Sequence, residues 1–314
     1  MTVNRPVDWH LLVSQLLNGL QLGLLLFLLA SGLTLIFGIM NFINLSHGAF
    51  YMVGAFVCAT VVQATGSLLT GIVLSLASLL VIGAAVEWLI ARKLYQNDHL
   101  DHVLVTFGLI LVFDTLAHII WGPAGMVIPL PEILNGQVRV GSFVIPSYRL
   151  VIIGNGLMVG VALYILITRS RLGMLIRAGA SDRDMVTALG VNIDRLYLVV
   201  FAIGAAMAGF AGLLIAPITE ASIGMGNEII IIAFVVVITG GIGSVQGAFY
   251  SALIIGILDT LGRSYLDDFL GLFLSNQAAE TAAPALSAMM VYILMATILV
   301  FRPQGLFSPS GLRK

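Results

Sequence analysis

Two short polar segments interrupt long apolar runs, and both carry residue types that can bind small ligands. The first runs from Gly38 to Gly48 and the second from Thr239 to Gly247. Polar backbone is tolerated at membrane depth only where protein or water covers it, and helix ends there present N–H groups to anions and carbonyls to cations. Each segment therefore fits either contact with a zwitterionic substrate or a tight turn between two spans. The candidate path residues are Asn41, Asn44, Ser46, His47, Gly243, Ser244 and Gln246.

Enzymatic and nucleotide-binding interpretations of these segments fail on their spacing. No Lys-Ser/Thr pair follows the glycines of the second segment, and Gln246 stands where a dinucleotide loop has its last glycine. Ser46 and His47 are neighbours, but no positioned base or oxyanion hole for a serine hydrolase can be assigned. The single cysteine, Cys58, excludes a disulfide framework or a multi-cysteine metal site. We therefore expect no catalytic residue, no metal and no bound cofactor.

A charge-rich segment, residues 169–195, carries the signature of a short capped helix. Ser181, with an aspartate three residues on, has the form of a capping box, and Gly190 suits the position after a helix end. Met185 and Leu189 would then lie four residues apart on one side as an apolar ridge. Such a helix fits docking into a groove of another protein, whereas a plain solvated loop would need only the arginines.

Ionisable residues inside apolar runs are costly and often functional. Asp114 and His118 lie four residues apart and would share a helix face. They fit a proton relay or ion site, or a structural pair in which each satisfies the other; we favour the structural interpretation. Two further combinations are expected to be local ion pairs, Glu87 with Arg92 and Asp259 with Arg263.

The elements that must position these residues are membrane helices. Hydrophobic residues make up 60% of the 314 residues and charged residues 9%, whereas a soluble domain has about 25% charged residues. We predict an all-α, polytopic transmembrane bundle forming one domain over residues 1–314, with eight or nine spans. The apolar segments lie near 10–38, 48–65, 67–91, 103–121, 149–168, 195–216, 226–242, 246–263 and 286–302.

The distribution of lysine and arginine predicts the orientation of the bundle. When nine segments alternate, ten basic residues fall on one side and four on the other, and the richer side is cytoplasmic. This places the segment at 169–195 and the C-terminus in the cytoplasm, and loops at 122–148 and 264–285 outside. A net charge of −1 gives no indication of nucleic acid as a partner, so membrane lipid is the expected surroundings.

Four motifs in order resemble those of the LivH-type permeases, the membrane subunits of ABC importers for branched-chain amino acids. The first is the run from Ser31 to Phe50, Ser-Gly-Leu-Thr-Leu-Ile-Phe-Gly-Ile-Met-Asn-Phe-Ile-Asn-Leu-Ser-His-Gly-Ala-Phe. The others are Arg-Leu-Gly-x-x-x-Arg-Ala at 171–178 with Ala-Leu-Gly-Val-Asn at 188–192, Gly-Gly-Ile-Gly-Ser-Val-Gln-Gly at 240–247, and Arg-Pro-Gln-Gly-Leu-Phe at 302–307. The resemblance covers nearly the whole chain.

The resemblance implies a division of labour between subunits. The segment at 169–195 would be the coupling loop that docks on an ATPase subunit, with Arg171, Gly173, Arg177, Asp182, Met185, Leu189 and Gly190 as its residues. It further implies a homologous, LivM-like second permease, two ATPase subunits that bind ATP and Mg²⁺, and a periplasmic binding protein that meets the outer loops near 122–148 and 217–228, all at a bacterial inner membrane.

Three alternatives stay open at this point. The family also includes importers of urea, short amides and other small acids, so the substrate is not fixed by the resemblance. An ion-coupled secondary transporter would use Asp114 and His118 as its coupling site. A passive channel would conduct its substrate without any partner.

Overall fold

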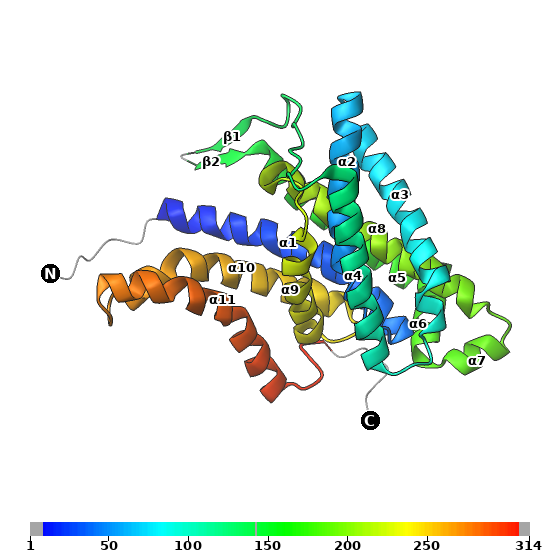
Figure 1. The fold of residues 1–314 in the computed structure, drawn as a ribbon. Helices are drawn as coiled ribbons and strands as arrows, with labels where there is room; N and C mark the ends of the chain where they lie inside the picture. The colour runs from blue at the N-terminus through cyan, green and yellow to red at the C-terminus, as the bar shows by residue number, and fades with distance from the viewer. Residues whose placement is uncertain (1–8, 142, 308–314) are drawn as a thin grey trace.

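The structure, a computed structural model, describes residues 9–141 and 143–307. It is a bundle of helices with one small hairpin (Figure 1). The elements are α1 (Trp9–Met40), α2 (His47–Thr65), α3 (Leu68–Leu89), the 3-10 turn η1 (Ala91–Lys93), α4 (His99–Trp121), β1 (Gln137–Val140), β2 (Phe143–Pro146), α5 (Ser147–Arg169), α6 (Arg171–Ser181), α7 (Arg183–Ala188), α8 (Ile193–Thr219), α9 (Met225–Gly240), α10 (Val245–Leu270) and α11 (Asn276–Phe301).

Eight of the described helices are long and apolar enough to cross a membrane. They are α1, α2, α3, α4, α5, α8, α10 and α11. The ninth predicted segment forms α9, which has 16 residues and is therefore about 24 Å long, shorter than a hydrocarbon core of about 30 Å. The predicted span count was ambiguous between eight and nine because α9 is too short to be counted as a membrane-spanning helix by length alone.

Helix directions show that the segment containing α9 nevertheless returns from one end of the bundle to the other. Both α8 and α10 run antiparallel to α1, so the chain must return between them; residues 220–224 and then α9, whose first turn packs on Gly48 inside the bundle, make this return. Counted this way the described chain makes nine passes, and Trp9 and Phe301 end at opposite ends of the bundle. The contacts that fix these directions are Ile39 with Tyr197, Gly32 with Gly204, Gly38 with Gly243 and Gly19 with Ile257.

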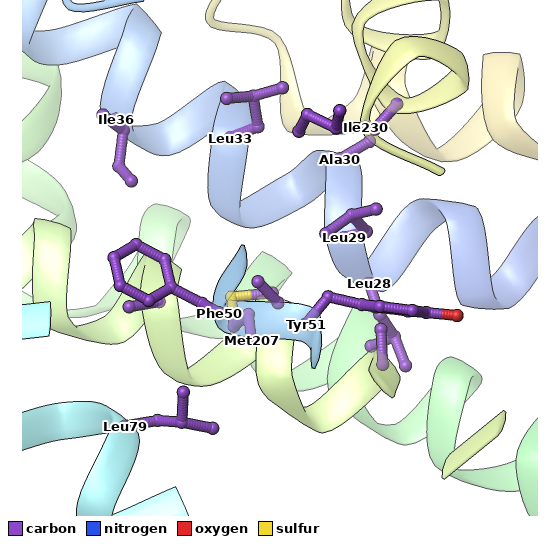
Figure 2. Close-up of a cluster of buried hydrophobic side chains, with 14 of the residues drawn as sticks. Leu28, Leu29, Ala30, Leu33, Ile36, Phe50, Tyr51, Leu79, Met207 and Ile230 are labelled. Atoms are coloured by element: carbon purple, nitrogen blue, oxygen red, sulfur yellow. The ribbon is translucent and has the colours of Figure 1, made fainter. Parts of the chain in front are cut away.

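The core is built around α1. In the most apolar 18-residue stretch of α1, 83% is buried inside the bundle, whereas the corresponding share for α11 is 11%. Helix α1 is therefore central and α11 lies at the periphery. Helices approach α1 and one another at glycines, as expected where lipid gives no hydrophobic drive and close packing must hold the bundle. Figure 2 shows the resulting cluster of apolar side chains from five helices, including Leu29, Leu33, Ile36, Phe50, Tyr51, Leu79, Met207 and Ile230.

Two predicted outer loops differ from the structure. The segment predicted as a loop at 264–285 is mostly helical, because α10 continues to Leu270 and α11 already begins at Asn276. The loop at 122–148 contains the antiparallel hairpin β1–β2, which the sequence did not predict. This loop is joined to the segment after α8 by an antiparallel bridge between Met126 and Ala221, whose backbone hydrogen bonds measure 2.8 and 2.9 Å.

Candidate functional site

The predicted coupling loop is in fact a pair of helices, α6 and α7. Ser170 caps α6, its Oγ accepting the Gly173 N–H at 3.0 Å. Asp182 caps α7, its Oδ1 accepting the Met185 N–H at 2.9 Å. The prediction that Ser181 caps this helix is wrong, because Ser181 is the last residue of α6. Figure 1 shows α7 at one edge of the bundle and β1–β2 at the opposite edge.

One face of α6 anchors it to the bundle and the other is exposed. Gly173, Ile176 and Gly179 are buried. Gly173 lies directly against the carbonyl groups that end α5, so this position has no room for a side chain, and Gly179 faces Leu196 of α8 and Ile39 of α1. The predicted coupling residues Arg171 and Arg177 lie on the exposed face, with Met174 56% exposed, and Arg177 donates a hydrogen bond to the Ile167 carbonyl.

The apolar ridge predicted on α7 is present. Met185 is 58% exposed and Leu189 76% exposed, whereas Val186 is buried and anchors the helix. Gly190 follows with φ +83°, the left-handed conformation expected of a glycine after a helix end, which confirms that prediction. Its N–H donates to the Thr187 carbonyl at 2.9 Å. The segment therefore presents apolar side chains to solvent on a firmly capped support.

The first polar break, residues 41–46, enters the interior of the bundle. His47 begins α2, and its ring Nε2 lies 3.2 Å from the carbonyl oxygen of Leu29 in α1. Leu29 precedes the end of α1 at Met40 by 11 residues, or about 16 Å along the helix. The chain therefore runs back alongside α1, into the bundle, before α2 begins. The first break is thus not a tight surface turn.

Polar side chains of this break are fully enclosed. Asn44, Ser46 and His47 have no exposed surface, whereas Asn41 is exposed. The Ser46 hydroxyl donates to Asn44 Oδ1 at 2.6 Å, so no serine–histidine pair of the hydrolase kind forms here. Asn44 Nδ2 and His47 Nδ1 lack a hydrogen-bond partner among the described residues. Buried polar atoms are almost always paired, yet the break and the first residue of α2 each carry one that is not.

The second break is a surface turn. It spans residues 241–244 between α9 and α10, with Gly241 and Gly243 at positive φ. Ser244 caps α10, its Oγ accepting the Gly247 N–H at 3.0 Å. Gly243 and Gln246 are exposed. The two breaks, which look alike in sequence, therefore have different structures.

Three of the sequence motifs meet at one end of the bundle. Gly38, at the end of α1, packs against the second break at Gly243. The C-terminal motif pairs with the end of α9, because the Leu306 N–H donates to the Thr239 carbonyl at 2.8 Å. Since α6 also contacts the end of α1, the α6–α7 segment, the second break and residues 302–307 lie at the same end.

The expected pairing of Asp114 with His118 is wrong. Asp114 Oδ2 instead accepts a hydrogen bond from Asn227 Nδ2 of α9 at 2.9 Å. The side chain of His118 is exposed. Asn227 was missed because it is 113 residues away in the chain and nothing in the local pattern marks it. Asp114 thus joins α4 to the first turn of α9.

The two other ion pairs are confirmed. Arg92 lies 3.1 Å from the fully buried Glu87 carboxylate, which also accepts the Tyr95 hydroxyl at 3.0 Å. Burial, together with this carboxylate, raises the pKa of the Tyr95 hydroxyl, so Tyr95 stays protonated as a donor. Arg263 donates to Asp259 at 2.9 Å. The pairs link groups five and four residues apart, and Arg92 also lies 4.0 Å from the Asp194 carboxylate of α8.

These features define a class of protein. A bundle with eight membrane-length helices among its described residues, a polar connection that enters its core between two helices and an exposed apolar ridge at one end is a multi-pass membrane protein of the permease type. The family described as "Branched-chain amino acid transport system / permease component" matches residues 15–299. The chain belongs to this family, whose members are transport components rather than enzymes.

Individual relatives cover almost the whole chain. It is 32% identical to the high-affinity branched-chain amino acid transport system permease protein LivH of Escherichia coli strain K12, over 93% of this chain and 96% of the relative. It is 28% identical to the corresponding protein BraD of Pseudomonas aeruginosa, over 98% and 99%. LivM of E. coli, another permease protein of such a system, is 27% identical over 96% of this chain and 72% of the relative. No solved structure matches significantly.

Proposed function

We propose that this chain is one permease subunit of an ATP-driven importer that moves branched-chain or related amino acids across a bacterial inner membrane. The proposal is supported by the named relatives, which are permease proteins of branched-chain amino acid transport systems. The observation that carries it is the exposed, capped α6–α7 segment at the end rich in lysine and arginine. Positive residues favour the cytoplasmic side, so this segment and the C-terminus face the cytoplasm.

The α6–α7 segment is the docking element for an ATPase subunit. Met174, Met185 and Leu189 are each more than half exposed, and arginines flank them. Apolar ridges of this kind fit grooves in partner proteins. The chain has no phosphate loop, so ATP and Mg²⁺ belong to two partner ATPase subunits. A homologous, LivM-like permease completes the membrane part, consistent with the similarity of this chain to LivM itself.

The first break supplies the polar contacts for the substrate. The Leu29 carbonyl can only accept, so the neutral His47 ring carries its proton on Nε2 and presents Nδ1 as an acceptor. Asn44 Nδ2 is a free donor at the start of α2, where the helix dipole favours anions. A zwitterionic amino acid matches this arrangement, its carboxylate meeting Asn44 and its ammonium His47. Ser46 holds Asn44, and Asn41 marks the entrance from the α6–α7 end.

Transport follows an alternating-access cycle. A loaded binding protein docks on the outer loops near 122–148 and 217–228, which the Met126–Ala221 bridge joins into one surface. Closure of the ATPase subunits displaces α6 and α7, and the enclosed break opens toward the path between the two permeases. Gly243, Ser244 and Gln246 lie at the inner end, where substrate leaves. The binding protein determines most of the substrate specificity, because the permease needs only polar contacts for the zwitterion and apolar space for the side chain.

Uptake in proteoliposomes tests this function. The complete complex, with its ATPases and binding protein, is supplied with radiolabelled leucine, urea or acetamide, with ATP inside the liposomes or with an ion gradient alone. We expect leucine uptake that requires both ATP and binding protein. Uptake of urea or acetamide under the same conditions would change the assigned substrate but would still support an ATP-driven importer. Uptake driven by an ion gradient without ATP would refute the proposal in favour of a secondary transporter.

A further inference from the structure

Tyr197 physically connects the α6–α7 segment to the first break. It lies in the first two turns of α8 and is 2% exposed. Its hydroxyl donates to the carbonyl oxygen of Ile39 at 3.3 Å. Over the ring of Tyr197, the Arg183 guanidinium of α7 lies 5.4 Å from the ring centroid, within range of a cation–π contact. One side chain therefore touches both α7 and the end of α1.

The Tyr197 hydroxyl contacts α1 at its C-terminal end, where backbone carbonyls lack hydrogen-bond partners within the helix. The last carbonyls of a helix have no N–H partner within the helix, and Ile39 is in the last turn of α1. Asn41 follows with φ +50°, a left-handed conformation that asparagine, after glycine, adopts most readily at a helix end, and its N–H donates to the Phe37 carbonyl at 2.9 Å. The left-handed Asn41 thus ends α1, and the Tyr197 side chain of α8 supplies a hydrogen bond to one of its last carbonyls.

Aromatic packing extends the connection into the break. Tyr95 meets the Tyr197 ring edge-on with centroids 5.1 Å apart, and Phe42 of the break meets Tyr95 edge-on at 5.9 Å. Phe42 is 1% exposed, and Tyr95 is fixed by its bond to Glu87. Close-packed interiors transmit displacement instead of absorbing it. A shift of Tyr197 must therefore move Phe42 as well as Ile39.

We propose that Tyr197 is the positioning residue through which displacement of α7 reaches the polar break at residues 41–46; this inference rests on the proposed function. When the ATPase subunits press on α6–α7, Arg183 moves with α7 and carries the Tyr197 ring. The hydroxyl then leaves Ile39, the end of α1 loses this hydrogen bond, and the break opens around Asn44. A switch between inward and outward states requires such a local repacking to have two discrete arrangements.

The test removes only the hydroxyl of Tyr197. Tyr197→Phe keeps the ring, its packing and the Arg183 contact. Tyr148→Phe is the matched control. Tyr148 is also buried, and its hydroxyl also donates to a helix carbonyl, in this case that of Leu214 in α8 at 2.8 Å. This contact lies far from α7. Both variants, and Arg183→Gln, are assembled with the ATPases and binding protein in proteoliposomes. Leucine uptake, ATP hydrolysis and the thermal midpoint of the complex are measured on the same samples.

We expect Tyr197→Phe and Arg183→Gln to lower uptake per ATP hydrolysed by about fivefold or more, the lower end of typical coupling between sites. ATP hydrolysis should stay within about twofold of the wild type, and Tyr148→Phe should keep the wild-type ratio at a similar thermal midpoint. An unchanged ratio in Tyr197→Phe, or an equal loss in Tyr148→Phe, overturns the inference alone. A wild-type complex without ATP-driven uptake overturns the proposed function and this inference with it.

Discussion

Truncation of Met185 tests the docking surface with little risk to the fold. The side chain is 58% exposed, so Met185→Ala removes few contacts within the chain, and we expect the free energy of unfolding to change by less than about 0.5 kcal/mol. In the complex the exposed part would be covered by an ATPase subunit. Full burial of a methionine side chain contributes about 1.5–3 kcal/mol, so the exposed 58% accounts for roughly 0.9–1.7 kcal/mol of docking.

That free energy corresponds to a measurable change in affinity. A loss of about 0.9–1.7 kcal/mol weakens ATPase binding about fourfold to twentyfold. Met185→Asp should weaken it further, because a carboxylate would have to be desolvated in an apolar groove. The assay is titration of the purified ATPase subunit onto the permease pair in lipid nanodiscs, followed by surface plasmon resonance.

Met158→Ala is the matched control for this titration. Met158 is 60% exposed, close to the value for Met185, but lies on α5 among lipid-facing residues. We expect this variant to bind the ATPase with wild-type affinity. Equal affinities for the wild type, Met185→Ala and Met185→Asp would refute the docking role of α7. An equal loss in Met158→Ala would show that the effect comes from the membrane region as a whole.

Three further predictions follow from the geometry. Gly190→Pro removes a backbone donor and demands negative φ where the structure has +83°, so the protein should insert normally but lose most uptake and ATPase assembly in pull-downs. Gly54→Leu forces a side chain into the backbone of Gly209 and should lower the thermal midpoint in detergent, whereas Gly154→Ala, with no atom within 4 Å, should not lower it. Asp114→Asn should leave ATP-driven uptake within about threefold of the wild type, because an amide oxygen can still accept the Asn227 hydrogen bond; a collapse of uptake that tracks the ion gradient would favour the secondary transporter.

Local features were the most predictable from the sequence. Apolar runs longer than about 18 residues gave the membrane helices, and the ion pairs of Glu87 and Asp259 followed from spacing of four or five residues. Gly190 was predictable because few residues other than glycine adopt a left-handed conformation after a helix. Each of these depends on neighbours in the chain, which the sequence shows directly.

Features set by distant contacts were not predictable. Both polar breaks contain glycine and small polar residues, yet only the first lies inside the bundle, because His47 finds the carbonyl of Leu29 and Gly48 packs on Gly226. Ser181 resembles a cap in sequence, but α6 extends through it and leaves the role to Asp182. The start of α11 was placed too late because hydropathy alone misses an alanine-rich helical stretch.

The most direct test of the account is cross-linking from position 185. Cys58, the single cysteine of the sequence, is buried, so Met185→Cys introduces a readily accessible thiol. We predict that a membrane-impermeant maleimide labels this thiol from the cytoplasmic side only, that added ATPase subunit protects it, and that a short bifunctional reagent joins it to that subunit. Labelling from the periplasmic side, or no protection and no cross-link with the ATPase present, would contradict the central claim that α6–α7 is the cytoplasmic docking element of an ATP-driven permease.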